Sequence, residues 1–351
     1  MSKMKRKKYH EVELLSLQIR KYARELDVKG IVDVGSGSGY LTVELSKYYP
    51  ILAIDGDESR IGHSEKRMND FPQCQKITHV TQRLDSSSLV GILSNYDLMP
   101  SDDGGLEFKK SCGKVKQKLL ITCLHACGDL SSEGLLNAFI QCSWVSCVIS
   151  IGCCYQMLTP KGFPLSKIVK AKTKSYKEKY PFNSIKEGNK CLLLPTYRSL
   201  NSACQTMIGF SDKRITDIWK AFSYRCLLES FIKTQDNDFD PYQPQLSIGT
   251  LKKDAFTNGF LHYAVTAKPE LLLLKDKLEE FVKSVSYPVL FGRISFITTI
   301  RRFFGPVMES LLLYDRYSYL SEYHDLHADL MTVFKHEISP RNVGIVAVRK
   351  I

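Results

Sequence analysis

Apolar positions in the first half of the chain alternate between a helical period and short buried runs. Between residues 10 and 27 the apolar side chains recur three or four positions apart among charges, which predicts an amphipathic helix. The runs that follow are short and continuously apolar, as in strands buried on both faces of a sheet. The elements expected in this half are helix 10–27, strand 31–34, helix 40–49, strand 51–55, helix 57–69 and strand 77–84.

The second half of the chain is less regular. Residues 86–117 are rich in Ser, Asp, Gly and Lys and predict a loop insertion, after which strands are expected at 119–124 and 145–151. Residues 160–297 do not continue the alternation and predict a large, mainly helical insertion. The remaining elements expected are helices 215–233, 269–284 and 298–322, and a hairpin of strands 329–337 and 343–349.

This order of elements predicts an α/β fold, because strands that alternate with helices form a parallel sheet through right-handed crossovers. The final hairpin would add antiparallel strands to that sheet. We expect residues 1–159 to hold the N-terminal helix and the first five strands. Residues 160–297 would form the insertion and substrate region, and residues 298–351 the long helix and hairpin that complete the core.

A glycine-rich loop provides the strongest chemical signal. The segment Asp33-Val34-Gly35-Ser36-Gly37-Ser38-Gly39 follows the first predicted strand and precedes a helix. Glycines at such a turn let the backbone approach a ligand closely, and the helix start supplies free N–H groups. Asp55 ends the second strand, where a carboxylate can accept hydrogen bonds from both ribose hydroxyls of an adenosine ligand.

The loop spacing favours S-adenosylmethionine over a dinucleotide. Dinucleotide sites use G-x-G-x-x-G, but Tyr40 stands where the third glycine would be. The acidic residue two positions before Gly35 suits a ligand with a free ammonium group, which Asp33 can bind directly or through water. The sequence therefore predicts a Rossmann-like S-adenosylmethionine-dependent methyltransferase core. The expected cofactor-binding residues are Asp33, Gly35, Ser36, Gly37, Gly39, Asp55, Leu84, Asp85 and His125.

Leu84 and Asp85 stand at the end of the third predicted strand, where an adenine would be held. The Asp85 carboxylate can accept a hydrogen bond from the exocyclic amine, or it can be an ordinary loop aspartate. The sequence does not decide between these two roles.

Two unusual segments end the fourth and fifth predicted strands, at the sheet edge where open α/β folds place their chemistry. Leu124-His125-Ala126-Cys127-Gly128-Asp129 ends one, and Gly152-Cys153-Cys154-Tyr155-Gln156 ends the other. The candidates for catalysis are His125, Asp129, Cys154 and Tyr155.

Each of these candidates has an alternative role. His125 is a proton acceptor or a cap of its strand, and Asp129 acts in catalysis or at a helix N-terminus. Tyr155 stacks on a base or closes the pocket. No metal is predicted, because adjacent cysteines on an extended segment point apart and no C-x-x-C is present, although His125, Cys127 and Cys154 could together hold zinc.

The charge distribution adds a possible partner. The formal net charge is +12, five of the first eight residues are Lys or Arg, and seven lysines fall between Lys161 and Lys179. Such a surface favours RNA, although a solvated lysine-rich face is the alternative. No signal peptide or membrane span is expected, and eleven irregularly spaced cysteines indicate reduced thiols and a cytoplasmic or nuclear location.

The chain resembles the methyltransferase-like 25 family, which includes ribosomal RNA adenine dimethylase domain-containing proteins. The resemblance is carried by several segments along nearly the whole chain, and it implies a methyltransferase without fixing the substrate. Methylation of the adenine N6 amine is not supported, since the usual Asn/Asp-Pro-Pro-aromatic segment is replaced by His-Ala-Cys-Gly-Asp. The matching segments are KKYHEV (7–12), DVGSGSGYLT, LHACGDLS, GCCYQMLT followed by Gly162-Phe163-Pro164, Ala203-Cys204-Gln205, SLLLYDRYSYLSE and ISPRNVGIVAVRK.

Three hypotheses remain at this stage. The first is an RNA methyltransferase that contacts phosphates through the basic N-terminus and Lys161–Lys179. The second is a protein methyltransferase that docks its substrate on residues 160–297. The third is a non-catalytic adaptor that binds the cofactor without turnover, although the intact glycine loop and Asp55 argue for retained cofactor binding.

Overall fold

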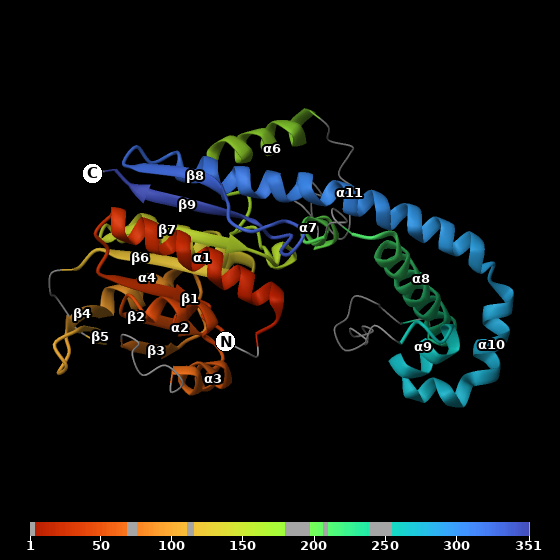
Figure 1. Cartoon of the computed structure of the whole chain (residues 1–351). Coiled ribbons are helices and arrows are strands. Elements are labelled where there is room, and N and C mark those ends of the chain that lie inside the picture. Colours follow the sequence, from red (N-terminus) through yellow and green to blue (C-terminus); the bar gives the residue numbers. More distant parts are fainter. Residues whose placement is uncertain are drawn as a thin grey trace. The chain divides into compact units, whose positions relative to one another are not determined.

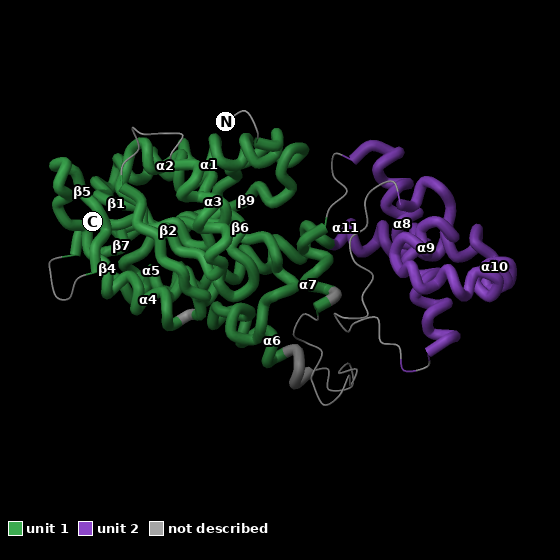
Figure 2. Tube along the Cα trace, turned by 90° about the horizontal axis from the view of Figure 1, so that it is seen from below, with its two compact units in different colours: residues 1–206, 305–351 green, residues 207–304 purple. Residues whose placement is uncertain are grey.

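The structure, a computed structural model, consists of two compact units. Unit 1 comprises residues 1–206 and 305–351, and unit 2 comprises residues 207–304 (Figure 2). The second unit is therefore shorter than the predicted insertion at 160–297. The described residues are 4–68, 76–110, 116–179, 197–205, 210–236, 238 and 255–350.

A seven-stranded sheet forms the centre of unit 1 (Figure 1). Its strand order is β3-β2-β1-β6-β7-β9-β8, in which the first five strands are parallel and β9 pairs antiparallel with both β7 and β8. The predicted α/β fold with a C-terminal antiparallel hairpin is confirmed. The strands are β1 (Gly30–Val34), β2 (Ile51–Asp55), β3 (Ile77–Thr81), β6 (Leu119–Ala126), β7 (Val145–Gly152), β8 (Leu326–Thr332) and β9 (Val343–Arg349).

Each face of the sheet packs against its own set of helices. Successive side chains of a strand point to opposite faces, so Ile31 packs in the cluster beneath α1 and α2. Val32 packs in the cluster with α4, α5 and the end of α11 (Tyr287–Leu320). Every residue of β1 and β2 is buried. The helices of unit 1 are α1 (Arg6–Glu25), α2 (Tyr40–Ser46), α3 (Glu58–Met68), α4 (Ser86–Asn95), α5 (Glu133–Gln141), α6 (Lys167–Lys179) and α7 (Tyr197–Ala203).

The prediction of a loop at 86–117 is wrong. Residues 86–110 contain α4 and an antiparallel pair of strands, β4 (Tyr96–Pro100) and β5 (Leu106–Lys110). Helix α4 forms because Asp85 caps it and because its apolar side chains recur at helical spacing, as at Leu89, Ile92 and Leu93. The hairpin packs Leu98 and Phe108 onto the same core.

Unit 2 is helical and has its own core, in which four of the ten buried side chains are aromatic. The predicted helix at 269–284 is divided into a 3-10 segment, η4 (Pro269–Leu274), and an α-helix. Helix α11 (Tyr287–Leu320) starts earlier than predicted and continues past Pro306 into unit 1. The other helices of this unit are α8 (Asp212–Gln235), α9 (Phe260–Ala267) and α10 (Lys275–Ser284). None of the described helices combines the length and apolar character needed to cross a membrane.

Candidate functional site

The glycine loop connects β1 to α2 in a conformation that glycine adopts without strain. Gly35, Gly37 and Gly39 all have positive φ, at 70°, 56° and 74°. A Cβ on Gly39 would lie 2.0 Å from the Oγ of Ser64, so helix α3 packs directly against the loop there. The buried hydroxyl of Ser36 has no hydrogen-bond partner among the described residues.

Two buried carboxylates support this loop from below. Asp33 accepts a hydrogen bond of 2.6 Å from the Thr42 hydroxyl, and burial raises the pKa of Asp33 to about 6, although that hydrogen bond and Lys8 act in the opposite direction. Asp55 accepts hydrogen bonds from the backbone N–H groups of Gly37 and Asp57, at 2.8 and 3.0 Å. The predicted residues of β1, the loop and β2 are thus brought together, and Asp55 holds the loop in place.

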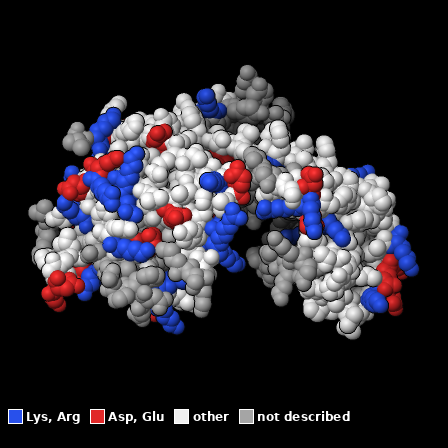
Figure 3. Space-filling view, viewed as in Figure 1, with Lys and Arg blue, Asp and Glu red and all other residues white. Residues whose placement is uncertain are grey.

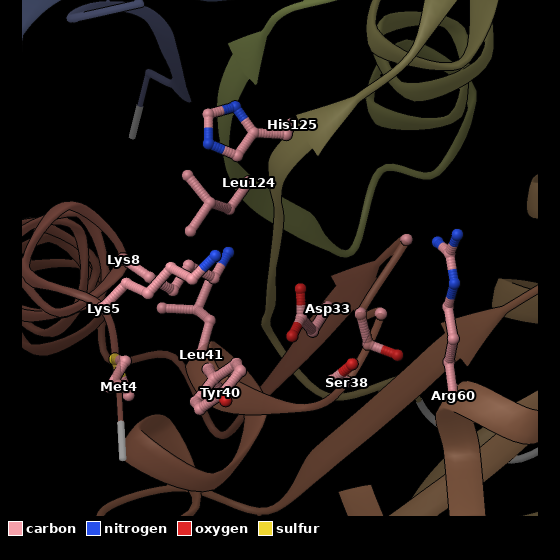
Figure 4. Close-up of a pocket in the computed structure, with 13 residues that line it drawn as sticks. Met4, Lys5, Lys8, Asp33, Ser38, Tyr40, Leu41, Arg60, Leu124 and His125 are labelled. Atoms are coloured by element: carbon pink, nitrogen blue, oxygen red, sulfur yellow. The ribbon is translucent and has the colours of Figure 1, made fainter. Parts of the chain in front are cut away.

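A pocket of about 430 Å³ opens above the loop at the carboxyl edge of the sheet. Asp33 and Ser38 face it from the loop side, Arg60 from α3, and Leu124 and His125 from the end of β6 (Figure 4). The full lining is Met4, Lys5, Lys8, Asp33, Gly35, Ser36, Gly37, Ser38, Tyr40, Leu41, Arg60, Leu124 and His125.

Two lysines from the start of α1 point their ammonium groups into this pocket (Figure 4). Lys8 is partly buried, and its burial lowers its pKa, while the carboxylates of Glu11 and Asp33 act in the opposite direction. Among the described residues Lys8 has no ion-pair partner, whereas the neighbouring Lys7 lies 3.5 Å from the Glu11 carboxylate. A partly buried ammonium without an ion-pair partner among the described residues is an energetic cost that an anionic ligand group would remove.

A buried carboxylate fixes α1 over the sheet edge. Glu11 is 2% exposed, and one of its oxygens lies 3.0 Å from Nε2 of His125 and accepts a hydrogen bond of 2.7 Å from the Ser339 hydroxyl. Burial raises the pKa of Glu11, but His125, Ser339 and Lys7 outweigh it and hold this pKa at about 2.

His125 is therefore engaged in the structure rather than free for chemistry. Its Nε2 faces Glu11, and its Nδ1 is buried without a hydrogen-bond partner among the described residues. The residue also adopts a positive φ of 70°, which turns the chain at the end of β6. His125 lines the pocket as predicted, but with this geometry it positions α1.

Three cysteine thiols lie together beyond the ends of β6 and β7. The Sγ atoms of Cys127 and Cys153 are 3.7 Å apart, and those of Cys153 and Cys154 are 3.3 Å apart. A hydrogen bond with Cys153 lowers the pKa of Cys127 to about 6. The expectation that the adjacent cysteines point apart is wrong, because the chain turns at Cys154, with φ −99° and ψ 66°, instead of remaining extended.

Four other predicted residues serve the fold instead of the pocket. Asp129 accepts hydrogen bonds from the backbone N–H and hydroxyl of Thr159, at 2.9 and 2.6 Å. Tyr155 is 1% exposed and donates to Glu309 at 3.1 Å, so the predicted stacking on a base is wrong. Asp85 caps α4 by accepting hydrogen bonds from the backbone N–H groups of residues 87 and 88. Leu84 lies outside β3 and packs on the core. Neither residue lines the pocket.

The sequence interpretation missed the contribution of α1 and α3. Lys5, Lys8 and Glu11 lie in or beside the family segment at 7–12, which was the available signal, although nothing in its spacing showed that it would meet the glycine loop. Arg60 and Tyr40 also line the pocket. No sequence signal identified Arg60.

Comparison with known sequences identifies the domain that carries this site. Residues 7–161 match the family model described as a methyltransferase domain. The human "Probable methyltransferase-like protein 25" is 21% identical, over 99% of this chain and 75% of that protein. The mouse protein of the same name is 23% identical, over 66% of this chain and 37% of that protein. The chain carries a methyltransferase domain, and the resemblance to the methyltransferase-like 25 family is supported.

Two solved structures that this chain resembles at low identity are methyltransferases by name. A magnesium protoporphyrin IX methyltransferase from Synechocystis with bound SAH is 14% identical, over 40% of this chain and 54% of that chain, with a TM-score of 0.26. An S-adenosylmethionine-dependent methyltransferase from Clostridium acetobutylicum is 16% identical, over 44% of this chain and 53% of that chain, with a TM-score of 0.25.

Replacing Gly39 by Ala should destabilise the protein more than replacing Gly37. Both substitutions put a side chain at positive φ, which costs about 1–2 kcal/mol, but only at Gly39 would the new Cβ overlap Ser64. We expect a lower urea midpoint for Gly39→Ala than for Gly37→Ala. Equal midpoints would show that α3 does not pack against the loop as described.

The raised pKa of Asp33 predicts a pH-dependent stability. The protonated form is favoured in the fold, so the Asp33 contribution is present at low pH and is lost as the pH rises through about 6. Relative to Asp33→Asn, the wild-type protein should gain about 1.4 kcal/mol of unfolding free energy between about pH 7 and about pH 5. Urea denaturation of both proteins at the two pH values measures this difference. Parallel pH profiles would contradict the burial of Asp33.

Proposed function

We propose that the pocket binds S-adenosylmethionine and that the chain transfers its methyl group to RNA. The observation that supports the cofactor assignment is the meeting, in one pocket, of the glycine loop, the Asp33 carboxylate and Lys8, whose ammonium has no ion-pair partner among the described residues. When bound, S-adenosylmethionine supplies an electrophilic methyl group on a sulfonium. Its amino-acid moiety carries one positive and one negative group, which matches Asp33 and Lys8.

Each end of the proposed ligand has a partner in the pocket. Asp33 would accept from the ligand ammonium, and Lys8 would donate to the ligand carboxylate as a charge-assisted hydrogen bond. Ser36 lines the same pocket, and its buried hydroxyl has no hydrogen-bond partner among the described residues. Asp55 already accepts from two backbone N–H groups, and its remaining lone pairs suit the ribose hydroxyls next to Gly37.

The protein contributes mainly position to the transfer step. The nucleophile must approach in line with the carbon–sulfur bond, and holding it there can account for much of the rate. Helix α1 carries Lys8 and is preceded by Lys5 at its N-cap, and the contact between Glu11 and His125 sets where that helix lies. We therefore assign His125 as a positioning residue for the cofactor, acting through Glu11.

The lysines of α6 support RNA as the substrate class. Lys161, Lys167, Lys170, Lys172 and Lys174 are all exposed, and Glu322 lies 3.7 Å from Lys167. The side chains of Lys177 and Lys179 lie outside the described residues. On the face shown in Figure 3 the basic side chains are mixed with acidic ones, whereas residues 161–179 hold seven lysines and only one acidic residue, Glu178.

A protein substrate is the second candidate, and one observation favours it. Helix α11 exposes large apolar side chains within unit 2, with Phe296 68% and Phe303 72% exposed. Exposed apolar patches commonly mark surfaces that bind other proteins.

Replacing Lys8 by Met should weaken cofactor binding, because the substitution keeps the aliphatic stem and removes the charge. Losing one hydrogen bond to a charged group costs about 1.5–3 kcal/mol, so the dissociation constant for S-adenosylmethionine should rise at least about 10-fold by isothermal titration calorimetry. Lys21→Met, at an exposed position of the same helix, is the control and should bind as the wild type does. Unchanged binding by Lys8→Met would remove Lys8 from the proposed site.

The substrate class can be tested with radiolabelled S-adenosylmethionine. Incubation of the full chain with cell RNA and protein should put the label into nuclease-sensitive material. Charge reversal at Lys170, Lys172 and Lys174 should weaken RNA binding and reduce its log–log salt slope by about 2, because each phosphate contact contributes about 0.7 on single strands. Matched reversals at Lys275, Lys277 and Lys283 of α10 should leave the slope unchanged. Label that is sensitive to protease would instead favour the protein substrate.

A further inference from the structure

The cysteine cluster is built from two neighbouring strand ends. Strands β6 and β7 are parallel partners whose last registered pair is Ala126 with Gly152, so the segments that follow leave the sheet side by side. Cys127 begins one segment, and Cys153 and Cys154 begin the other. Their three Sγ atoms all lie within 4.8 Å of one another.

The spacing of these thiols matches the coordination of a zinc ion. A Zn–S distance of about 2.3 Å in a tetrahedral site places two sulfur atoms about 3.8 Å apart. Cys127 and Cys153 are already at 3.7 Å, and Cys153 and Cys154 are at 3.3 Å, so ion binding requires small movements. All three residues are half-buried, which gives an ion access without a full aqueous shell.

The surrounding backbone holds the cluster in place. The carbonyl oxygen of Cys154 accepts from the N–H groups of Gly128 and Met157, at 3.3 and 3.1 Å, which ties the two segments together. The Cys204 thiol donates to the carbonyl of Cys153 at 3.2 Å, and so supports the turn from behind. A site in which ligands are fixed before the ion arrives binds it with little reorganisation.

We propose that Cys127, Cys153 and Cys154 bind one Zn²⁺ ion as thiolates, with the fourth coordination position open to water or an incoming ligand. Among the described residues no other Cys, His, Asp or Glu joins the group, and three protein ligands with one exchangeable position are typical of zinc sites that act in chemistry. None of the three cysteines lines the cofactor pocket, although the thiols of Cys127 and Cys153 contact the carbonyl oxygen of His125, a lining residue, at 3.5 and 3.4 Å. The site does not depend on the proposed methyl transfer.

Cobalt substitution tests this site without an activity assay. The reduced full chain, titrated with Co²⁺, should bind one equivalent with thiolate-to-cobalt charge-transfer absorption and strong visible bands, which Zn²⁺ then removes. Binding of Co²⁺ should be weaker by about 10–100-fold or more in each of the variants Cys127→Ser, Cys153→Ser and Cys154→Ser. Losing only a hydrogen-bond partner of a metal ligand already weakens metal binding by that factor, so losing a ligand should cost at least as much. Cys226→Ser in unit 2 is the matched control and should bind as the wild type does.

A second measurement uses only the wild-type protein, in case a variant does not fold. Zn²⁺ should protect the three cysteines of the cluster from alkylation, read by peptide mass spectrometry, while Cys226 reacts at an unchanged rate. Absence of charge-transfer absorption with all thiols reduced, equal protection of Cys226, or full binding by the serine variants would each overturn the proposal. The proposal would also be overturned if Cys127 and Cys153 were isolated as a disulfide and the protein still failed to bind Zn²⁺ after that disulfide had been reduced.

Discussion

The Glu11 carboxylate is the interaction on which the ligand pocket depends. It joins three segments that are distant in the chain: α1 itself, the end of β6 through His125, and the β8–β9 connection through Ser339. Burial of an isolated carboxylate is costly, so this one is stable only while its partners stay in place. Because α1 and its N-cap supply Lys8 and Lys5, one wall of the pocket exists only when these contacts form.

The central sheet and the glycine loop were predictable because their signals are local. Buried strands are continuously apolar, and the spacing of its glycines identifies the loop. The hairpin at 96–110 was missed because its strands are short and because the serines before it resemble a loop, whereas Ser88 and Asp85 in fact form a capping box. Serine is common both in loops and at helix N-termini, so the serines alone do not distinguish a loop from the start of a helix. The packing of the residues that follow makes that distinction.

Side-chain roles were predicted less well than positions. Tyr155 stands at a strand end as expected, but its surroundings are set by Glu309, which is far away in the sequence. Helix α11 likewise provides Asp315, which accepts from the backbone N–H groups of residues 165 and 166, and Arg316, which donates to Ser131. The segment SLLLYDRYSYLSE, which contains Asp315 and Arg316, therefore fixes the loops beyond β6 and β7. Contacts of this kind have no periodicity from which to infer them.

The position of the chain ends matters for anyone who adds to them. Met4 and Lys5 line the pocket, so residues joined ahead of them would emerge at its opening. Arg349, by contrast, donates to the carbonyl of Val145 at the start of β7, at the opposite edge of the sheet. A purification handle or a fluorescent reporter placed after β9 would leave the pocket entrance clear. One placed at the N-terminus would be attached next to the pocket and would compete with ligands for its entrance.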